Sequence, residues 1–185
     1  MPAAKRISKE AIIDAAEAVL RTGGFEAINA RSVAKALGCS TQPIYLSFRN
    51  MEELKSALTQ RAIEQHTRRV RASLRAHEGC DSRYSSYGMG FVQFAAQEKQ
   101  LFRWLYLEDN QPGRHQEDVL EPEIIRTVMD EFGYDEVTAR AFHRDMTYYS
   151  YGLAILANTG HLALTETELR EAFRREFRAL AAYYG

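Results

Sequence analysis

The chain is organised around the segment Asn29–Phe48, NARSVAKALGCSTQPIYLSF. Two short apolar patterns at helical spacing predict two helices in it, and Gly38 between them can adopt the left-handed conformation that a tight turn needs. Ala34 leaves room where the helices cross, and Ile44 fills the space between them. The apolar positions are Val33, Ala34 and Leu37 in the first helix and Ile44, Tyr45 and Phe48 in the second. The spacing therefore predicts a helix-turn-helix.

A helix-turn-helix places its second helix in the major groove of DNA, so the first residues of that helix meet base edges. Gln42 is the sharpest candidate for base reading, because its amide can pair with both exposed groups of adenine. Thr41 and Pro43 can pack on thymine methyl groups, and Arg31 can reach a guanine or a phosphate. For each of these side chains, plain solvation or helix capping is the alternative role.

With its flanks, this segment resembles the DNA-binding domain of the tetracycline repressor (TetR) family of bacterial regulators, over roughly Ile7–Ala62. The motifs are Asn-x-Arg at the start of the first helix and Ile-Tyr-x-x-Phe in the second, followed by a long amphipathic helix. The resemblance implies the base contacts above and phosphate contacts by Tyr45 and Ser47. It departs in two places, since the family often has histidine where Ser47 stands and lysine where Met51 stands, and the next lysine here is Lys55. The predicted DNA contacts are Arg31, Thr41, Gln42, Pro43, Tyr45, Ser47 and Lys55.

Apolar periodicity along the whole chain predicts an all-α fold of about nine helices, with no β pattern. The predicted division is a helix-turn-helix domain over 1–50, a connecting helix over 51–78 and a ligand-binding and dimerisation domain over 79–185. The second boundary rests on the polar break His77–Ser82. The connecting helix is polar in its second half, which is typical of a rod between domains or of a solvated surface helix. Beyond the break, the apolar run Leu101–Leu107 predicts a buried helix.

Charge and motif content narrow the function classes. The formal net charge is -1, so the chain as a whole has no basic character that would indicate a nucleic-acid partner. Residues 1–61 hold nine Lys+Arg against six Asp+Glu, an excess that mildly favours a DNA-facing N-terminal part over ordinary charge scatter. The sequence shows no nucleophile beside a base, no phosphate-cradling glycine loop and no metal-ligand spacing. We therefore expect neither an enzyme nor a cofactor.

Cysteine usage and hydropathy indicate the compartment. Cys39 and Cys80 are the only cysteines, and neither position favours a structural disulfide, which suits a reducing environment. The apolar runs are too short to span a membrane, and the N-terminus lacks the apolar core of a signal peptide. The expected localisation is cytoplasmic, without membrane association.

The last two predicted helices, over about Asp135–Asn158 and Glu166–Tyr184, carry apolar stripes. So much apolar area is unfavourable in water, and the resemblance implies that these helices pair with their copies as a four-helix bundle in a homodimer. The alternative is that the final helix packs only on its neighbour within the monomer. The predicted dimer contacts are Leu153, Leu156, Leu169, Phe173, Phe177, Leu180 and Tyr184.

The C-terminal part is also rich in aromatic side chains with a few polar tips, the composition of an apolar pocket with orienting groups. The resemblance implies a small-molecule site among the predicted helices that lie between about Tyr84 and Asn158. Ordinary core packing is the alternative for each residue, and the aromatic content favours an apolar or aromatic ligand. The predicted ligand-site residues are Phe91, Phe94, Phe102, Trp104, Tyr106, His143, Tyr148 and Tyr151.

These features together predict a ligand-switched repressor. Its dimer would read an inverted repeat with half-sites about 34 Å apart or somewhat more, and a small molecule would change that spacing. Some relatives respond in the opposite sense, so the direction of the switch stays open. The competing hypothesis is a helical dimeric sensor or interaction protein whose helix-turn-helix does not bind DNA, because Met51 replaces a lysine and the charge excess is small.

Overall fold

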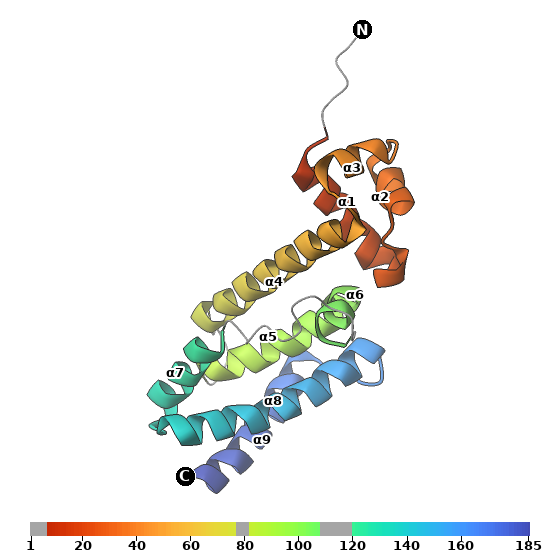
Figure 1. Ribbon diagram of the computed structural model, residues 1–185. Helices are drawn as coiled ribbons and strands as arrows, with labels where there is room; N and C mark the ends of the chain where they lie inside the picture. The colour runs from red at the N-terminus through yellow and green to blue at the C-terminus, as the bar shows by residue number, and fades with distance from the viewer. Residues whose placement is uncertain (1–6, 77–81, 108–119) are drawn as a thin grey trace. The chain divides into compact units, whose positions relative to one another are not determined.

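The computed structural model describes residues 7–76, 82–107 and 120–185, with the backbone alone at 73–76. All regular structure in these ranges is helical, so the all-α prediction is confirmed (Figure 1). The polar segment 108–116 and most of the break predicted at 77–82, with Cys80, lie outside the described ranges.

The helices follow the predicted order along the chain. Two short turns, η1 and η2, come after α1 and α6, and α4 continues for 26 residues without interruption. The elements are α1 (Lys9–Gly23), η1 (Phe25–Ala27), α2 (Ala30–Leu37), α3 (Gln42–Ser47), α4 (Met51–Ala76), α5 (Arg83–Gln97), α6 (Lys99–Phe102), η2 (Arg103–Leu107), α7 (Glu121–Phe132), α8 (Glu136–Thr159) and α9 (Glu166–Tyr184).

Polar side chains cap the start of several of these helices. The Ser8 hydroxyl accepts a hydrogen bond from the backbone N–H of Ala11 at 3.1 Å, and Asn50 Oδ1 accepts one from Glu53 N–H at 2.9 Å. Thr165 and Glu168 form a reciprocal capping box at the start of α9. Each cap satisfies backbone donors that a helix N-terminus leaves without partners, so it fixes where the helix begins.

The run Leu101–Leu107 differs from the single predicted helix. It forms the end of α6 and then a π-helical turn, η2. Leu101, Phe102 and Trp104 are buried, whereas Arg103 is exposed. Within this π turn Trp104 thus belongs to the core, while Arg103 faces solvent.

The described residues form two compact units. The first lies within Met1–Glu64 and Glu98–Arg114, and the second lies within Gln65–Gln97 and His115–Gly185. Residue packing, which defines the units, therefore assigns α6 and η2 to the unit that holds the helix-turn-helix. The predicted domains, in contrast, follow the order of the chain.

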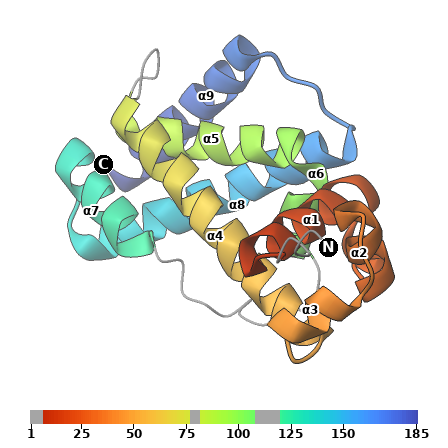
Figure 2. The ribbon, with the colours of Figure 1, turned by 90° about the horizontal axis from the view of Figure 1, so that it is seen from above.

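In the second unit, α5 packs against α8 and α9, and α7 packs against α8 (Figure 2). Gly88 marks the closest approach, since a Cβ atom there would stand 2.6 Å from Cε1 of Phe173 on α9. Helix α5 runs through this glycine unbroken. A glycine is therefore what lets the Phe173 ring lie against the backbone of α5.

Candidate functional sites

The turn of the helix-turn-helix has the geometry that its sequence predicts. Asn29 Oδ1 accepts hydrogen bonds from the N–H groups of Arg31 and Ser32, both at 3.0 Å, and fixes the start of α2. Gly38 adopts the left-handed conformation with φ 66° and ends that helix. Cys39 N–H then donates to the carbonyl of Ala34 at 3.0 Å, which closes the turn. These contacts set the direction in which the chain enters α3.

Buried residues hold α2 and α3 within the first unit. Val33 and Ala34 of α2 are buried, as are Ile44 of α3 and Phe48 just beyond it. The exposed fraction of Ile44 is 1%. Burial of both Ile44 and Ala34 is consistent with the predicted arrangement, in which an aliphatic side chain fills the space between two crossing helices. One face of α3 is thus buried at Ile44.

The opposite face of α3 is open. Gln42 is exposed, and Tyr45 keeps 53% of its surface exposed. Thr41 and Pro43 are half-buried at the start of the helix, where Thr41 makes no capping hydrogen bond through its side chain. Leu46 keeps 79% of its surface exposed, and the sequence analysis predicted no contact for it. These side chains form a surface with hydrogen-bonding and apolar groups side by side, which suits the edges of bases.

The remaining predicted DNA contacts differ in their surroundings. Arg31 is exposed at the start of α2, and Ser47 is half-buried at the end of α3. Lys55, in contrast, places its ammonium 4.4 Å from the centroid of the Phe25 ring and 3.6 Å from a carboxylate oxygen of Glu52. Its side chain is only 19% exposed. Lys55 therefore takes part in the packing of the unit, and its phosphate contact stays a prediction.

Two further cations lie close to α3. The Arg49 side chain is 88% exposed, and its Nε donates a hydrogen bond to Glu53 Oε2 at 3.1 Å. Lys9 lies 3.8 Å from the same carboxylate and 4.7 Å from the centroid of the Phe48 ring. The contacts with Arg49 hold the pKa of Glu53 below its ordinary value, with a smaller effect from Lys9. Sequence reasoning missed both cations, because helical spacing does not show that Lys9 and Arg49 both contact the carboxylate of Glu53.

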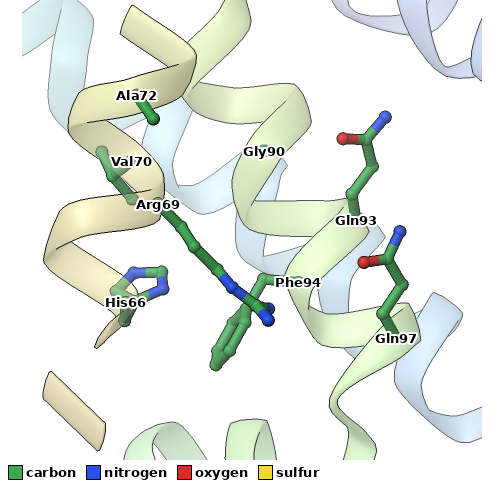
Figure 3. A pocket seen from close by; sticks show the side chains of 8 residues that line it. All are labelled: His66, Arg69, Val70, Ala72, Gly90, Gln93, Phe94 and Gln97. Atoms are coloured by element: carbon green, nitrogen blue, oxygen red, sulfur yellow. The ribbon is translucent and has the colours of Figure 1, made fainter. Parts of the chain in front are cut away.

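A cavity of about 230 Å³ lies between α4 and α5 in the second unit (Figure 3). The Arg69 side chain extends from α4 toward Phe94 of α5, and Gln93 and Gln97 extend from α5 in a common direction. The imidazole of His66 lies against Phe94, with ring centroids 4.6 Å apart. The lining residues are His66, Arg69, Val70, Ala72, Gly90, Gln93, Phe94 and Gln97.

Among the described residues that line this cavity, Phe94 is the only one that the sequence predicted for the ligand site. The ring centroid of Phe91 lies 4.9 Å from that of Tyr151 and 6.3 Å from that of His66. His143 is buried with its Nδ1 atom 2.9 Å from the Tyr84 hydroxyl, and burial raises the pKa of Tyr84. That arrangement matches the structural role open to a lone histidine.

The other predicted ligand-site residues have different surroundings. Phe102, Trp104 and Tyr106 belong to the first unit, and Tyr148 is 68% exposed on α8. The ligand contacts of these side chains stay predictions. Sequence reasoning missed the polar lining on α4 because His66 and Arg69 lie in a charged stretch typical of a solvated helix.

The predicted dimer stripe is partly used inside the second unit. Leu169 and Phe173 are buried, and the Phe177 ring packs on Phe132 and Phe142 at centroid distances of 4.8 and 5.4 Å. The Tyr184 hydroxyl donates a hydrogen bond to Asp145 Oδ2 at 2.5 Å. Leu169 and Phe173 therefore offer no free surface to a second copy, as the monomer-packing alternative expected. Exposed apolar side chains remain elsewhere on these two helices, at Tyr148, Ile155 and Leu156 of α8 and Tyr183 of α9.

Comparison with known proteins identifies the helix-turn-helix unit. The family described as "Bacterial regulatory proteins, tetR family" matches residues 12–58, which include α2, α3 and the packing contacts described above. This segment is therefore similar to the DNA-binding domain of TetR-family regulators, as the sequence predicted. The match supports the predicted class of DNA-binding transcriptional regulator. A search of curated proteins found no match.

Solved structures share the fold over nearly the whole chain. A proposed transcriptional regulator from Pseudomonas aeruginosa PAO1 has a TM-score of 0.69 at 17% identity, covering 94% of this chain and 90% of that one. A proposed TetR-family regulator from Vibrio parahaemolyticus has a TM-score of 0.64 at 16% identity, covering 92% and 97%. The multidrug binding protein EbrR, complexed with malachite green, has a TM-score of 0.61 at 17% identity, covering 93% and 96%. At these identities the likeness extends to the TetR fold alone.

Neither a metal-binding cluster nor a membrane-spanning helix occurs among the described residues. Its described residues contain no group of three or more His, Cys, Asp or Glu side chains placed to hold a metal ion. Nor does any described helix combine the length and apolar character needed to cross a bilayer.

Proposed function

We propose that this protein is a ligand-responsive repressor of the TetR family that binds a palindromic operator as a homodimer and is released by a small molecule. The observation that carries the proposal is the geometry of α3. Its inner face is fixed by buried Ile44, while Gln42 and Tyr45 face solvent beside it. A rigid helix with an open polar face is what reading in the major groove requires.

The contacts divide into base reading and positioning. Gln42 would pair with an adenine, and Thr41 and Pro43 would contact neighbouring thymine methyl groups. Tyr45 and Ser47 would bind phosphates, and Arg31 would reach a guanine or a phosphate from the start of α2. Arg49 adds a highly exposed cation at the end of α3, although Glu53 offsets part of its charge.

Dimerisation would supply what one copy lacks. A single unit offers few free positive charges for phosphates, so its affinity for DNA should be low and sensitive to salt. Tyr148, Ile155 and Leu156 are exposed along one face of α8, which is an unfavourable arrangement in water. We propose that this face pairs with its copy and brings two recognition helices onto an inverted repeat. Because the proposed partner is DNA, we place the protein in the cytoplasm.

The small molecule would act through the second unit. EbrR, which has the same fold, is a multidrug binding protein, and this chain has a cavity between α4 and α5. The helix α4 is continuous from the helix-turn-helix unit to that cavity. A ligand that binds one position of α4 better than another would therefore change the occupancy of the DNA-binding state.

Selection from a randomised DNA pool tests the operator claim. We expect the purified protein to enrich a palindromic sequence at moderate salt and Gln42→Ala to lose the enrichment. Gln60→Ala is the matched control, because it makes the same change at an exposed position of α4. Wild-type protein that enriches no sequence, with or without candidate ligands, would favour the dimeric sensor that does not bind DNA. The engagement of Lys55 with Glu52 and Phe25 is the observation that favours this second function.

A further inference from the structure

We infer that the cavity between α4 and α5 is a site for a small carboxylate with an apolar or aromatic body. This inference rests on the proposed function and deepens it, because it names the chemical class of the effector. The sequence analysis predicted an apolar or aromatic ligand in the C-terminal part, and its predicted site contained no arginine or lysine.

The charge of the lining decides the class. Arg69 is a permanent cation with a planar fork of N–H donors, so it can offer a bidentate pair of hydrogen bonds to a carboxylate even when it also has another partner. Among the described residues that line the cavity, none is acidic. A bound anion would therefore meet its preferred partner in the guanidinium of Arg69.

The neutral polar side chains are consistent with this charge. Gln93 and Gln97 stand one turn apart on α5, and their amides can donate N–H groups to the same ligand. The imidazole of His66 stands on the opposite helix. Hydrogen-bond donors thus come from both walls of the cavity, which fixes the orientation of a group that accepts hydrogen bonds.

The remaining lining sets the body of the ligand. Phe94 and Val70 are buried apolar side chains, and Gly90 leaves the wall of α5 without a side chain. The Phe94 ring can stack on a flat apolar group while Arg69 holds the carboxylate. The volume of about 230 Å³ lies below the roughly 300–1,000 Å³ typical of pockets for drug-sized ligands, so one or two rings should fill it.

Calorimetric titration of the full chain with matched acids and amides tests the inference. The probes are benzoate and 2-naphthoate against benzamide and 2-naphthamide, which keep the rings and remove the charge. We expect at least one acid to bind and its amide to bind about tenfold more weakly or not at all, since charge-assisted hydrogen bonds are about twice as strong as neutral ones. Equal binding of acid and amide, or no binding of either acid at millimolar concentration, would overturn the inference.

Two variants locate the binding. Arg69→Gln removes the lining cation and should weaken the acid by about tenfold or more, whereas Arg68→Gln makes the same charge change one residue away and should bind within about twofold of wild type. Loss of affinity in both variants, or in neither, would mean that the carboxylate does not bind at Arg69. Circular dichroism of each variant checks that it is folded, and the acid-to-amide comparison uses wild type alone.

Operator binding without any probe is measured separately. A protein that enriches a palindrome but binds no acid keeps the proposed function and loses this inference. A protein that binds 2-naphthoate through Arg69 but enriches no DNA keeps the site and loses the repressor.

Discussion

The ring of Trp104 lies 5.5 Å from the ring of Phe25, centroid to centroid, with the two planes at 56°. Lys55 contacts Phe25 as well, and its ammonium is 4.4 Å from the ring centroid. Phe25 belongs to the turn before the helix-turn-helix, whereas Trp104 follows it by nearly eighty residues in the sequence. A segment from the second half of the chain therefore completes the core of the DNA-binding unit.

Trp104→Ala should destabilise that unit by about 3–5 kcal/mol, because it removes a large, fully buried side chain and leaves a cavity. Tyr183→Ala removes an aromatic side chain that is 79% exposed and should change stability by less than about 0.5 kcal/mol. Urea unfolding followed by circular dichroism measures both effects. Equal small effects for the two variants would show that Trp104 does not hold the unit together.

Gly88→Ala should destabilise the second unit by about 1–3 kcal/mol, because the new methyl group would stand 2.6 Å from the Phe173 ring. Gly152→Ala is the matched control. It lies in α8 with nothing within 4 Å of the added Cβ, so it should stabilise the helix by about 0.5–1 kcal/mol. The midpoint temperature of thermal unfolding should fall for Gly88→Ala and rise for Gly152→Ala. The same sign for both would contradict the packing of α9 against α5.

Glu168 makes the stability of α9 depend on pH. The backbone N–H of Thr165 donates a hydrogen bond to its carboxylate at 2.8 Å, and the Thr165 hydroxyl donates another at 2.7 Å, so the pKa of Glu168 is lowered. A lowered folded pKa contributes stability that is present above the ordinary glutamate pKa of about 4.3 and is lost as the pH falls through the folded value.

Glu168→Gln should therefore be less stable than wild type at pH 7, and the difference should shrink below about pH 4.3. Glu171→Gln removes a carboxylate of the same helix that has no part in the cap, so it tests the effect of charge alone. Urea titrations at several pH values measure the free energy of unfolding of each variant. A difference between wild type and Glu168→Gln that stays constant as the pH falls would contradict the capping argument.

Leu156→Glu should convert the proposed dimer to a monomer, because it places a charge on the exposed apolar face of α8. Ala96→Glu introduces the same charge at an exposed position of α5 and should leave the dimer intact. Light scattering after size-exclusion chromatography measures the mass. A wild-type monomer, or a dimer unaffected by Leu156→Glu, would contradict the proposed interface.

Local signals in the sequence were enough for the elements and for the helix-turn-helix. Asn29 has an oxygen that can accept from the first turn of a helix, and Gly38 can adopt the left-handed conformation, so both ends of α2 follow from the residues at those ends. The burial of Ile44 follows from its spacing in the same way. Such features depend on neighbours within a few residues along the chain.

Contacts between segments that are far apart in the chain could not be predicted from the sequence. The aromatic run that includes Trp104 was assigned to a ligand site because its composition suits a pocket, yet this residue packs in the other unit. Arg69 lies in a charged stretch, where periodicity gives no sign that α5 will stand opposite it. Phe173 of α9 was assigned to a dimer surface by its apolar stripe, yet its ring lies against Gly88 of α5 within the monomer. Long-range packing decides each of these cases.

Titration of the purified protein into the enriched palindrome and into scrambled DNA of the same composition tests the central claim most directly. The account predicts affinity for the palindrome at least about a thousandfold higher at physiological salt, and a loss of most of that ratio in Gln42→Ala. Equal affinity of wild type for both DNAs, falling in parallel as salt rises, would contradict it, because the protein would then bind phosphates without reading bases.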